Sequence, residues 1–244
     1  MTGTGRPLRV DAVIPALDEE GAIAGVVRGL LEARIDAAEG GRIRRVVVVD
    51  NGSTDGTAEV ARGAGALVVR EPRRGYGAAC LRGLGELDRI GAPDVVVFAD
   101  GDGADVPGDL PALLAPIAAG RAELVIGSRT LGEAERGSLT PRQRAGNAVA
   151  VGLIRALYGT RCTDLGPFRA ARYPSLRALG MADLDYGWTV EMQVKALRRG
   201  QRVVEVPVRY RRRAAGRSKV SATVRGTVGA GWKILSTIAR HAVG

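Results

Sequence analysis

Asp100 and Asp102 are the residues of this chain whose type and spacing point most directly to chemistry. They follow the run Val95–Phe98, whose β-branched and aromatic residues predict a buried strand. The two acids would then lie at the carboxyl end of a strand, where open α/β sheets bind ligands. Carboxylates this close repel one another unless a cation lies between them, and Mg²⁺ commonly binds one or two carboxylates together with substrate phosphates. The pattern favours a metal-phosphate site, with a solvated Asp-Gly turn as the alternative.

The residues that are scarce in this chain exclude several mechanisms. His241 is the single histidine, so we expect neither a Ser-His or Cys-His nucleophile pair in a core site nor a multi-histidine metal centre. The two cysteines, Cys80 and Cys162, have no local spacing pattern, which argues against a disulfide scaffold and a zinc site. Chemistry must therefore depend on carboxylates, arginine, lysine, backbone amides and a metal.

The chain is strongly basic, with a formal net charge of +10, and its cations cluster between Arg198 and Lys219. A scattered excess would indicate only a solvated surface, whereas a cluster favours an anionic partner such as phosphate or acidic lipid. Aromatic residues make up only 4% of the 244 residues, and single-strand nucleic-acid binders depend on stacking aromatics. We therefore expect no nucleic acid as a partner.

The elements that must position Asp100 and Asp102 alternate between strand and helix. Apolar runs predict strands at 8–15, 43–50, 66–70, 94–99 and 123–127, and helical periodicity predicts helices at 19–38, 57–63, 77–87 and 109–118. After residue 128 we expect a helix at 142–158, a short strand at 168–171, a helix at 188–198, a strand at 203–206 and an amphipathic helix at 220–244. This order predicts an α/β fold: a doubly wound, mostly parallel sheet with helices on both faces and a C-terminal helical extension.

Three other turns follow predicted strands and would face the same edge of the sheet as Asp100. The turn 15–20 ends in acids that favour a helix N-terminus. In the turn 50–57, Asp50 has the chemistry to bind a ribose or base edge, and the turn is neither a Walker loop nor a dinucleotide fingerprint. The turn 73–77 places glycines before a helix, as in anion pockets. Each is also explained as an ordinary turn or cap, but together they form a constellation.

In order, these motifs resemble those of family 2 glycosyltransferases with the GT-A fold. They are VIPALDEE at 13–20, VDNGSTDGT at 49–57, RGYGAA at 74–79, DGD at 100–102 and VIGSR at 125–129, followed by TDLGPFR at 163–169, WTVEMQ at 188–193 and RAAGRSK at 213–219. Within that family the chain looks most like polyprenyl-phosphate (dolichyl-phosphate) mannosyl- and glucosyltransferases. The resemblance covers about residues 8–238 and implies one GT-A domain: a nucleotide-sugar half at 1–128, an acceptor half with a closing segment at 129–219, and the amphipathic helix at 220–244.

The resemblance also implies roles for single residues. The nucleotide-sugar would be bound by Pro15, Ala16, Glu20, Asp50, Asn51, Gly77, Asp100 and Ser218. The metal, Mg²⁺ or Mn²⁺, would be held by Asp100 and Asp102, with Asp105 as a substitute third ligand because Ala104 stands where the family often has a polar ligand. The acceptor would be bound by Arg129, Asp164, Arg169 and Arg142, or Arg144 in its place. Arg213, Ser218 and Lys219 match a basic segment that closes over the donor, so the catalytic set would be Asp100, Asp102, Arg129, Arg213 and Lys219.

The implied reaction moves a hexose from UDP- or GDP-hexose to an acceptor, with metal-assisted departure of the nucleoside diphosphate. We favour a polyprenyl phosphate as acceptor, because an ionised phosphate needs no general base and the chain has no histidine for that task. Two alternatives stay open: a soluble hydroxyl acceptor, with Asp164 or Glu191 as base, and a non-catalytic nucleotide-binding or nucleic-acid-binding protein.

Contact with a membrane is a further expectation. The predicted helix 220–244 either lies on an anionic membrane surface or packs on the core, because apolar residues recur at helical spacing among cations. Residues 1–7 lack a signal-peptide pattern, and the sequence contains no run of about 18 uncharged apolar residues. We therefore expect a cytoplasmic protein, peripheral at the inner face of the plasma membrane.

Overall fold

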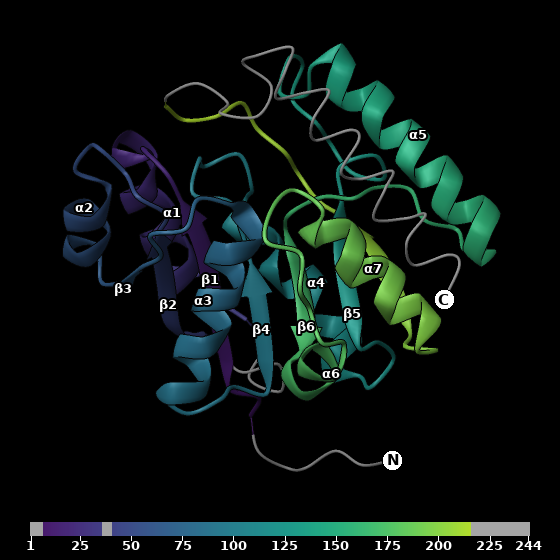
Figure 1. Ribbon diagram of the computed structural model, residues 1–244, viewed down its shortest axis with the longest axis horizontal. Coiled ribbons are helices and arrows are strands. Elements are labelled where there is room, and N and C mark those ends of the chain that lie inside the picture. Colours follow the sequence, from purple (N-terminus) through teal and green to yellow (C-terminus); the bar gives the residue numbers. More distant parts are fainter. Residues whose placement is uncertain (1–6, 36–40, 216–244) are drawn as a thin grey trace.

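The computed structural model describes residues 7–35 and 41–215, which form a seven-stranded sheet covered by helices (Figure 1). The strands are β1 (Val10–Ala16), β2 (Ile43–Asp50), β3 (Leu67–Arg70), β4 (Val95–Phe98), β5 (Leu124–Ser128), β6 (Arg169–Arg172) and β7 (Val203–Pro207), in the spatial order β3-β2-β1-β4-β6-β5-β7. The helices are α1 (Glu20–Glu32), α2 (Thr57–Gly63), α3 (Tyr76–Arg89), α4 (Leu110–Ala118), α5 (Pro141–Tyr158), α6 (Tyr173–Ala178) and α7 (Trp188–Arg198), with a 3₁₀ turn, η2, at Pro107–Asp109. The predicted α/β, mostly parallel architecture is confirmed.

The register of the sheet brings the predicted turns together. β1 pairs in parallel with β2 and with β4, so that Ala16 lies opposite Asp50 and Val13 opposite Phe98. The loops after these three strands therefore leave the sheet at one edge, as predicted. β6 is the exception among the paired strands, because it runs antiparallel between β4 and β5. Through β6 and β7 the second half of the chain contributes strands to the same sheet.

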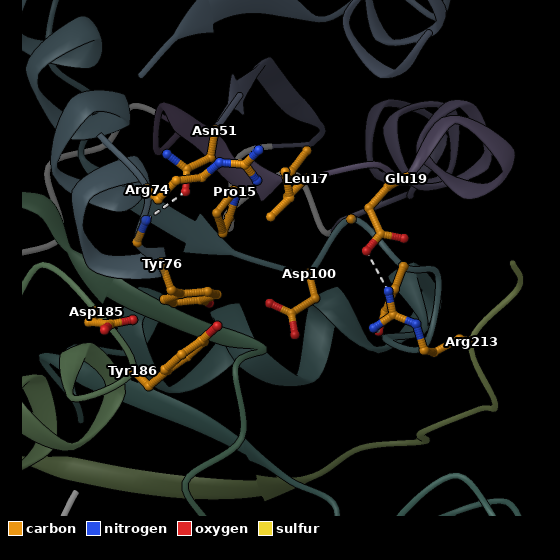
Figure 2. Close-up of a pocket in the computed structure, with 14 residues that line it drawn as sticks. Pro15, Leu17, Glu19, Asn51, Arg74, Tyr76, Asp100, Asp185, Tyr186 and Arg213 are labelled. Carbon is orange, nitrogen blue, oxygen red and sulfur yellow. Dashed lines mark hydrogen bonds and ion pairs between the residues drawn. The ribbon is translucent and has the colours of Figure 1, made fainter. Parts of the chain in front are cut away.

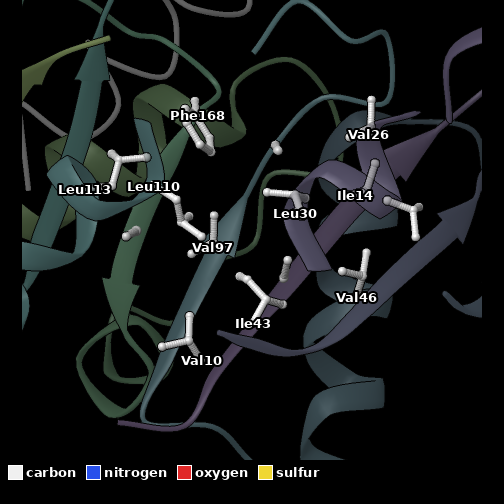
Figure 3. Close-up of a cluster of buried hydrophobic side chains, with 14 of the residues drawn as sticks. Val10, Ile14, Val26, Leu30, Ile43, Val46, Val97, Leu110, Leu113 and Phe168 are labelled. Atoms are coloured by element: carbon white, nitrogen blue, oxygen red, sulfur yellow. The ribbon is translucent and has the colours of Figure 1, made fainter. Parts of the chain in front are cut away.

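The buried strand β2 explains why both faces of the sheet are covered. Val46 and Val48 belong to the apolar cluster beneath α1 and α4, which Figure 3 shows in part, whereas Val47 and Val49 belong to the cluster beneath α3 and α7. Successive side chains of a strand point to opposite faces, so an unbroken valine run needs an apolar partner on each side. Burying each such side chain contributes about 1.5–3 kcal/mol.

The long helix α5 lies apart from the sheet, at the rim of the molecule in Figure 1. Its N-terminus has a capping box, in which the Thr140 hydroxyl accepts from the Gln143 backbone amide and the Gln143 side chain accepts from the Thr140 backbone amide. At its C-terminus, Gly159 ends the helix in the left-handed conformation. Its buried side chains Ala150, Val151 and Ile154 pack in a third cluster with residues of α7 such as Val190. Other side chains of α5, such as Val149 and Leu153, are exposed.

The predicted elements differ from the structure in two respects. The first helix ends at Glu32 rather than at residue 38. The short helix α6 was not predicted, because its six residues, with a proline at position 174, are too few to show a periodicity. The expected helix at 220–244, Ser218 and Lys219 lie outside the described residues. Among the helices of the described part, none has both the length and the apolar character needed to cross a bilayer.

Candidate functional site

A cavity of about 500 Å³ opens where the loops after β1, β2 and β4 meet (Figure 2). It is lined by Pro15, Ala16, Leu17, Glu19, Asn51, Arg74, Gly75, Tyr76, Asp100, Gly101, Asp102, Asp185, Tyr186 and Arg213. We call it the first cavity. Its position at the carboxyl ends of parallel strands is where open α/β sheets bind ligands.

Asp100 and Asp102 both line the first cavity, with different hydrogen-bond partners. Asp100 Oδ1 is buried and has no hydrogen-bond partner among the described residues. Burial and the negative charge of Asp102 raise the pKa of Asp100 to about 7. Asp102 is buried too, and one of its oxygens accepts from the Ala104 amide at 2.9 Å. A buried carboxylate oxygen without a partner beside a second carboxylate fits a hard divalent cation, which prefers oxygen ligands.

Arg213 supplies a cation to this acidic pair. It donates to Asp102 Oδ2 at 2.7 Å and also pairs with Glu19, as the dashed line in Figure 2 shows. The Ala214 amide donates to the Asp102 carbonyl at 2.9 Å and the Arg211 amide to the Ala104 carbonyl at 2.8 Å. Backbone hydrogen bonds therefore hold the segment 211–214 along the loop that carries both aspartates.

The opposite wall is built by the turn 73–77 and a loop from the second half of the chain. Asn51 positions the turn: its Nδ2 donates to the Arg73 carbonyl at 2.7 Å and its Oδ1 accepts from the Gly75 amide at 2.9 Å. Gly77 allows the loop before α7 to approach, since a Cβ there would lie 2.0 Å from the Asp183 carbonyl oxygen. That close approach places Tyr186 next to Tyr76 at the cavity wall (Figure 2).

A second cavity of about 560 Å³ lies between α5 and the loops at 129–134 and 163–164. We call it the second cavity. It is lined by Arg129, Thr130, Ala134, Leu139, Gln143, Arg144, Asn147, Ala148, Val151, Gly152, Arg155, Thr163 and Asp164. Three of these residues are arginines and one is an acid, so the second cavity has a cationic lining.

Arg129 is fixed by Asp164 within the second cavity. Its Nε and Nη2 donate to the two carboxylate oxygens at 2.8 and 2.7 Å, and its backbone amide donates to the same group at 2.8 Å. The guanidinium also lies over the Tyr210 ring, 5.1 Å from its centre. Burial opposes the charge, but the hydrogen bonds that Arg129 donates to the Asp164 carboxylate prevail and raise the pKa of Arg129. Arg129 is therefore a permanent, oriented cation.

The structure brings eight of the sixteen predicted site residues to one of the two cavities. Pro15, Ala16, Asn51, Asp100, Asp102 and Arg213 line the first cavity, and Arg129 and Asp164 line the second. The sequence thus identified the residues that belong to motifs at strand ends.

Three predicted nucleotide-binding residues support the first cavity without lining it. Glu20 accepts from the Gly56 amide at 3.2 Å, and its neighbour Glu19 lines the cavity instead. Asp50 is buried and accepts from the Ser53 amide at 2.9 Å, which shapes the turn after β2. Gly77 acts through the close approach described above. In this structure these residues shape the loops around the first cavity, and their contact with a nucleotide stays a prediction.

The second cavity distinguishes between the two arginines considered for the acceptor, and the prediction for Arg169 needs correction. Arg142 does not line the second cavity, whereas Arg144 does. Arg169 is fully buried and donates to the carbonyls of Gly166 and Thr189, so it has no surface to offer an acceptor. Its role is to join the chain around β6 to α7.

The predicted three-carboxylate metal set is not assembled either. Within 7–35 and 41–215, no three His, Cys, Asp or Glu side chains are grouped as ligands of one metal ion. Asp105 is buried, does not line the first cavity and accepts from the Asp100 amide at 3.1 Å, so it braces the loop. Asp100 and Asp102 remain as the two candidate ligands.

Several lining residues were missed by the sequence analysis. Three of them, Glu19, Arg74 and Tyr76, belong to the motifs at 13–20 and 74–79, so the sequence motifs already pointed to their loops. Asp185 and Tyr186 come from an irregular loop about a hundred residues farther along the chain, and only the folded chain places them at the first cavity.

Residues 11–180 match the sequence model of glycosyl transferase family 2. The chain belongs to this family. An uncharacterized glycosyltransferase of Mycobacterium tuberculosis is 38% identical over 231 residues, covering 93% of this chain and 98% of that protein. The undecaprenyl-phosphate mannosyltransferase of Micrococcus luteus is 32% identical, covering 74% of this chain and 77% of that protein.

Solved structures agree on the fold of this family 2 member. The glucosyl-3-phosphoglycerate synthase of Mycobacterium tuberculosis, in complex with Mn²⁺, UDP and glucosyl-3-phosphoglycerate, has a TM-score of 0.73 at 23% identity, covering 97% of this chain and 80% of that protein. A mycobacterial protein structure has a TM-score of 0.75 at 25% identity, covering 99% of this chain and 76% of that protein. Both support the GT-A fold.

Proposed function

We propose that this family 2 glycosyltransferase moves a hexose from a nucleoside diphosphate sugar in the first cavity to the phosphate of a polyprenyl phosphate in the second cavity. The observation that carries the proposal is the position of Asp100 and Asp102 at a cavity built from the loops after β1, β2 and β4. A buried carboxylate oxygen without a partner is costly, and a metal-bound diphosphate would supply what it lacks.

The donor end of the reaction depends on charge neutralisation. Asp100 and Asp102 would hold Mg²⁺ or Mn²⁺, which when bound would offset the charge that develops on the departing nucleoside diphosphate. Arg213, already at the first cavity, would place a second cation against the phosphates, and Ser218 and Lys219 remain predicted members of the same segment. The Mn²⁺ and UDP named in complexes of the tuberculosis synthase support this donor class.

The acceptor end depends on an oriented cation. Arg129, held by Asp164, and the neighbouring Arg144 and Arg155 give the second cavity a lining suited to a phosphate. An ionised phosphate oxygen attacks without a general base, which suits a chain with one histidine. The names of the Micrococcus luteus relative and of the polyprenol monophosphomannose synthase of Mycolicibacterium smegmatis, 32% identical over 72% of this chain, support a polyprenyl phosphate.

A water-soluble phosphorylated acceptor is the second candidate. It is favoured by the glucosyl-3-phosphoglycerate found in a complex of the tuberculosis synthase, which shares the fold. Both acceptors bear a phosphate, so the lining of the second cavity alone suits either one.

A transfer assay tests the proposal. Purified protein is incubated with Mn²⁺, a labelled UDP- or GDP-hexose and either polyprenyl phosphate or 3-phosphoglycerate. We expect label in the organic phase with polyprenyl phosphate, and we expect Asp102→Asn to abolish it while Glu59→Gln, an exposed acid on α2, leaves it unchanged. Label only in the aqueous product would favour the second candidate, and full activity of Asp102→Asn would contradict the metal role.

A further inference from the structure

The exposed apolar side chains of this protein gather on α5. Within the described residues, five large apolar side chains are exposed, namely Leu67, Leu131, Val149, Leu153 and Leu157. Three of the five lie on α5, four residues apart, and therefore on one stripe of the helix surface. Ala145 and Ala156 are exposed on the same helix. An apolar stripe on an otherwise polar surface marks an interaction site.

The charge around this stripe has one sign. From residue 136 to residue 163 the sequence contains Arg136, Arg142, Arg144, Arg155 and Arg161 and no acidic residue. On α5 itself, Arg142, Arg144 and Arg155 are exposed. A second copy of this chain seated on the same face would oppose arginine with arginine, so charge complementarity disfavours self-association and favours an anionic partner.

We propose that the outer face of α5, with Val149, Leu153 and Leu157 at its centre, docks on the surface of an anionic lipid bilayer. The exposed surface of α5 has its apolar stripe in the middle and Arg144 and Arg155 along one side. Such a helix can lie in the plane of a bilayer interface, with its apolar side chains below the headgroups and its cations among them. The described helices include none able to cross a bilayer, so docking on the surface is the mode of contact that α5 offers.

The docking face is continuous with the second cavity, which ties it to the proposed function. Four residues of α5 line that cavity, namely Arg144, Ala148, Gly152 and Arg155. The exposed Val149 and Leu153 come directly after Ala148 and Gly152 in the sequence. If the acceptor is a polyprenyl phosphate, its phosphate would reach Arg129 past Arg144 and Arg155 while its apolar chain stayed in the bilayer. This step rests on the proposed function, whereas the docking itself does not.

Vesicle binding tests the docking. The full chain is sedimented with phosphatidylcholine vesicles with or without phosphatidylglycerol, and we expect binding only with the anionic lipid, weakening as salt is added. Val149→Asp and Leu153→Asp should each weaken binding at least about tenfold, because each loses the burial of an apolar side chain and adds a repelled charge. Leu67→Asp, at a similarly exposed leucine on β3, should bind as the wild type does. Equal binding by all three variants would overturn the proposal.

A fluorescent label separates the bilayer from other occupants. Cys80 and Cys162 are buried, so Leu153→Cys is labelled selectively with an environment-sensitive thiol dye. Anionic vesicles should shift its emission to the blue, and brominated lipid should quench it, with neither effect for the Leu67→Cys control. A dye at position 153 that is already shielded without vesicles and unchanged by them would show that residues 216–244 or another protein surface cover the face, and would overturn the proposal.

The same variants distinguish failure of the docking from failure of the proposed function. Transfer to a short, water-soluble isoprenyl phosphate should be unchanged in Leu153→Asp, while transfer to vesicle-borne polyprenyl phosphate should fall about tenfold. Vesicle binding without transfer to any isoprenyl phosphate would contradict the function and leave the docking supported. Transfer from vesicles at the wild-type rate by Leu153→Asp would overturn the docking alone.

Discussion

Arg213 and Asp102, 111 residues apart in the chain, are joined by a hydrogen bond of 2.7 Å at the edge of the first cavity. The same guanidinium pairs with Glu19. One arginine thus pairs with two carboxylates from different strand-end loops, and the proposed function assigns one of them, Asp102, to a metal ion. Arg213 therefore connects the segment 211–214 to the charge balance of the first cavity.

Replacing Arg213 by alanine should have opposite effects on metal binding and on turnover. Without nucleotide, Mn²⁺ affinity should rise about tenfold, because a competing cation next to Asp102 is gone. Transfer should fall about 10²-fold, because one group that offsets charge on the leaving diphosphate is lost. Calorimetry and the transfer assay measure the two effects. Arg212→Ala, at an exposed neighbour that pairs with Glu135, is the control; unchanged Mn²⁺ affinity in Arg213→Ala would show that the pair does not compete with metal.

Asp164→Asn should destabilise the fold as well as impair transfer. The substitution leaves the Arg129 cation, 14% exposed, without its carboxylate, and breaking a pair at such a site costs about 3 kcal/mol or more. Urea denaturation measures the free energy of unfolding. Glu59→Gln, in the exposed pair with Arg62, should change it by less than about 1 kcal/mol. Equal stabilities of the two variants would mean that Arg129 is solvated well enough to need no partner.

Gly77→Ala and Gly85→Ala, both on α3, should move stability in opposite directions. A Cβ at position 77 would lie 2.0 Å from the Asp183 carbonyl oxygen, so the loop bearing Asp185 and Tyr186 must shift and nucleotide affinity should drop. At position 85 nothing lies within 4 Å, so alanine should stabilise the helix by about 0.5–1 kcal/mol. Thermal denaturation and UDP binding check both. This packing would be contradicted if Gly85→Ala were less stable than the wild type, or if Gly77→Ala kept the stability and UDP affinity of the wild type.

The two thiols should be inert in the folded protein. Burial raises the pKa of Cys162 from 9.0 to about 12 and raises the pKa of Cys80 well above its ordinary value. Ellman's reagent at pH 8 should therefore detect no thiol natively and both thiols in guanidinium. Because an unfolded thiol ionises first, stability should be lost as pH rises above 9 toward 12. Rapid native labelling of either cysteine would contradict the burial.

The strand-end motifs were predictable because local chemistry marks them. The valine run of β2 and the acids after β4 carry their signals in consecutive residues, and parallel pairing then brings Ala16 beside Asp50. The roles within a motif were less predictable. Glu19 and Glu20 are chemically identical neighbours, and only the turn geometry decides which of them faces the first cavity and which holds Gly56.

Long-range placement accounts for the remaining errors. Arg169 was expected at an acceptor because it belongs to the motif TDLGPFR, but β6 enters the sheet between β4 and β5 and buries it against α7. Tyr186 reaches the first cavity because two glycines of the turn 73–77 admit its loop. Neither relationship has a signature within a short stretch of sequence.

The most direct test of the account is Mn²⁺ binding followed by electron paramagnetic resonance in the presence of UDP or GDP. We expect one of these nucleotides to recruit Mn²⁺ to the wild-type protein and to Glu59→Gln. Asp100→Asn and Asp102→Asn should each abolish the recruitment while remaining folded by circular dichroism. Nucleotide-dependent Mn²⁺ binding of undiminished affinity in both aspartate variants would contradict it.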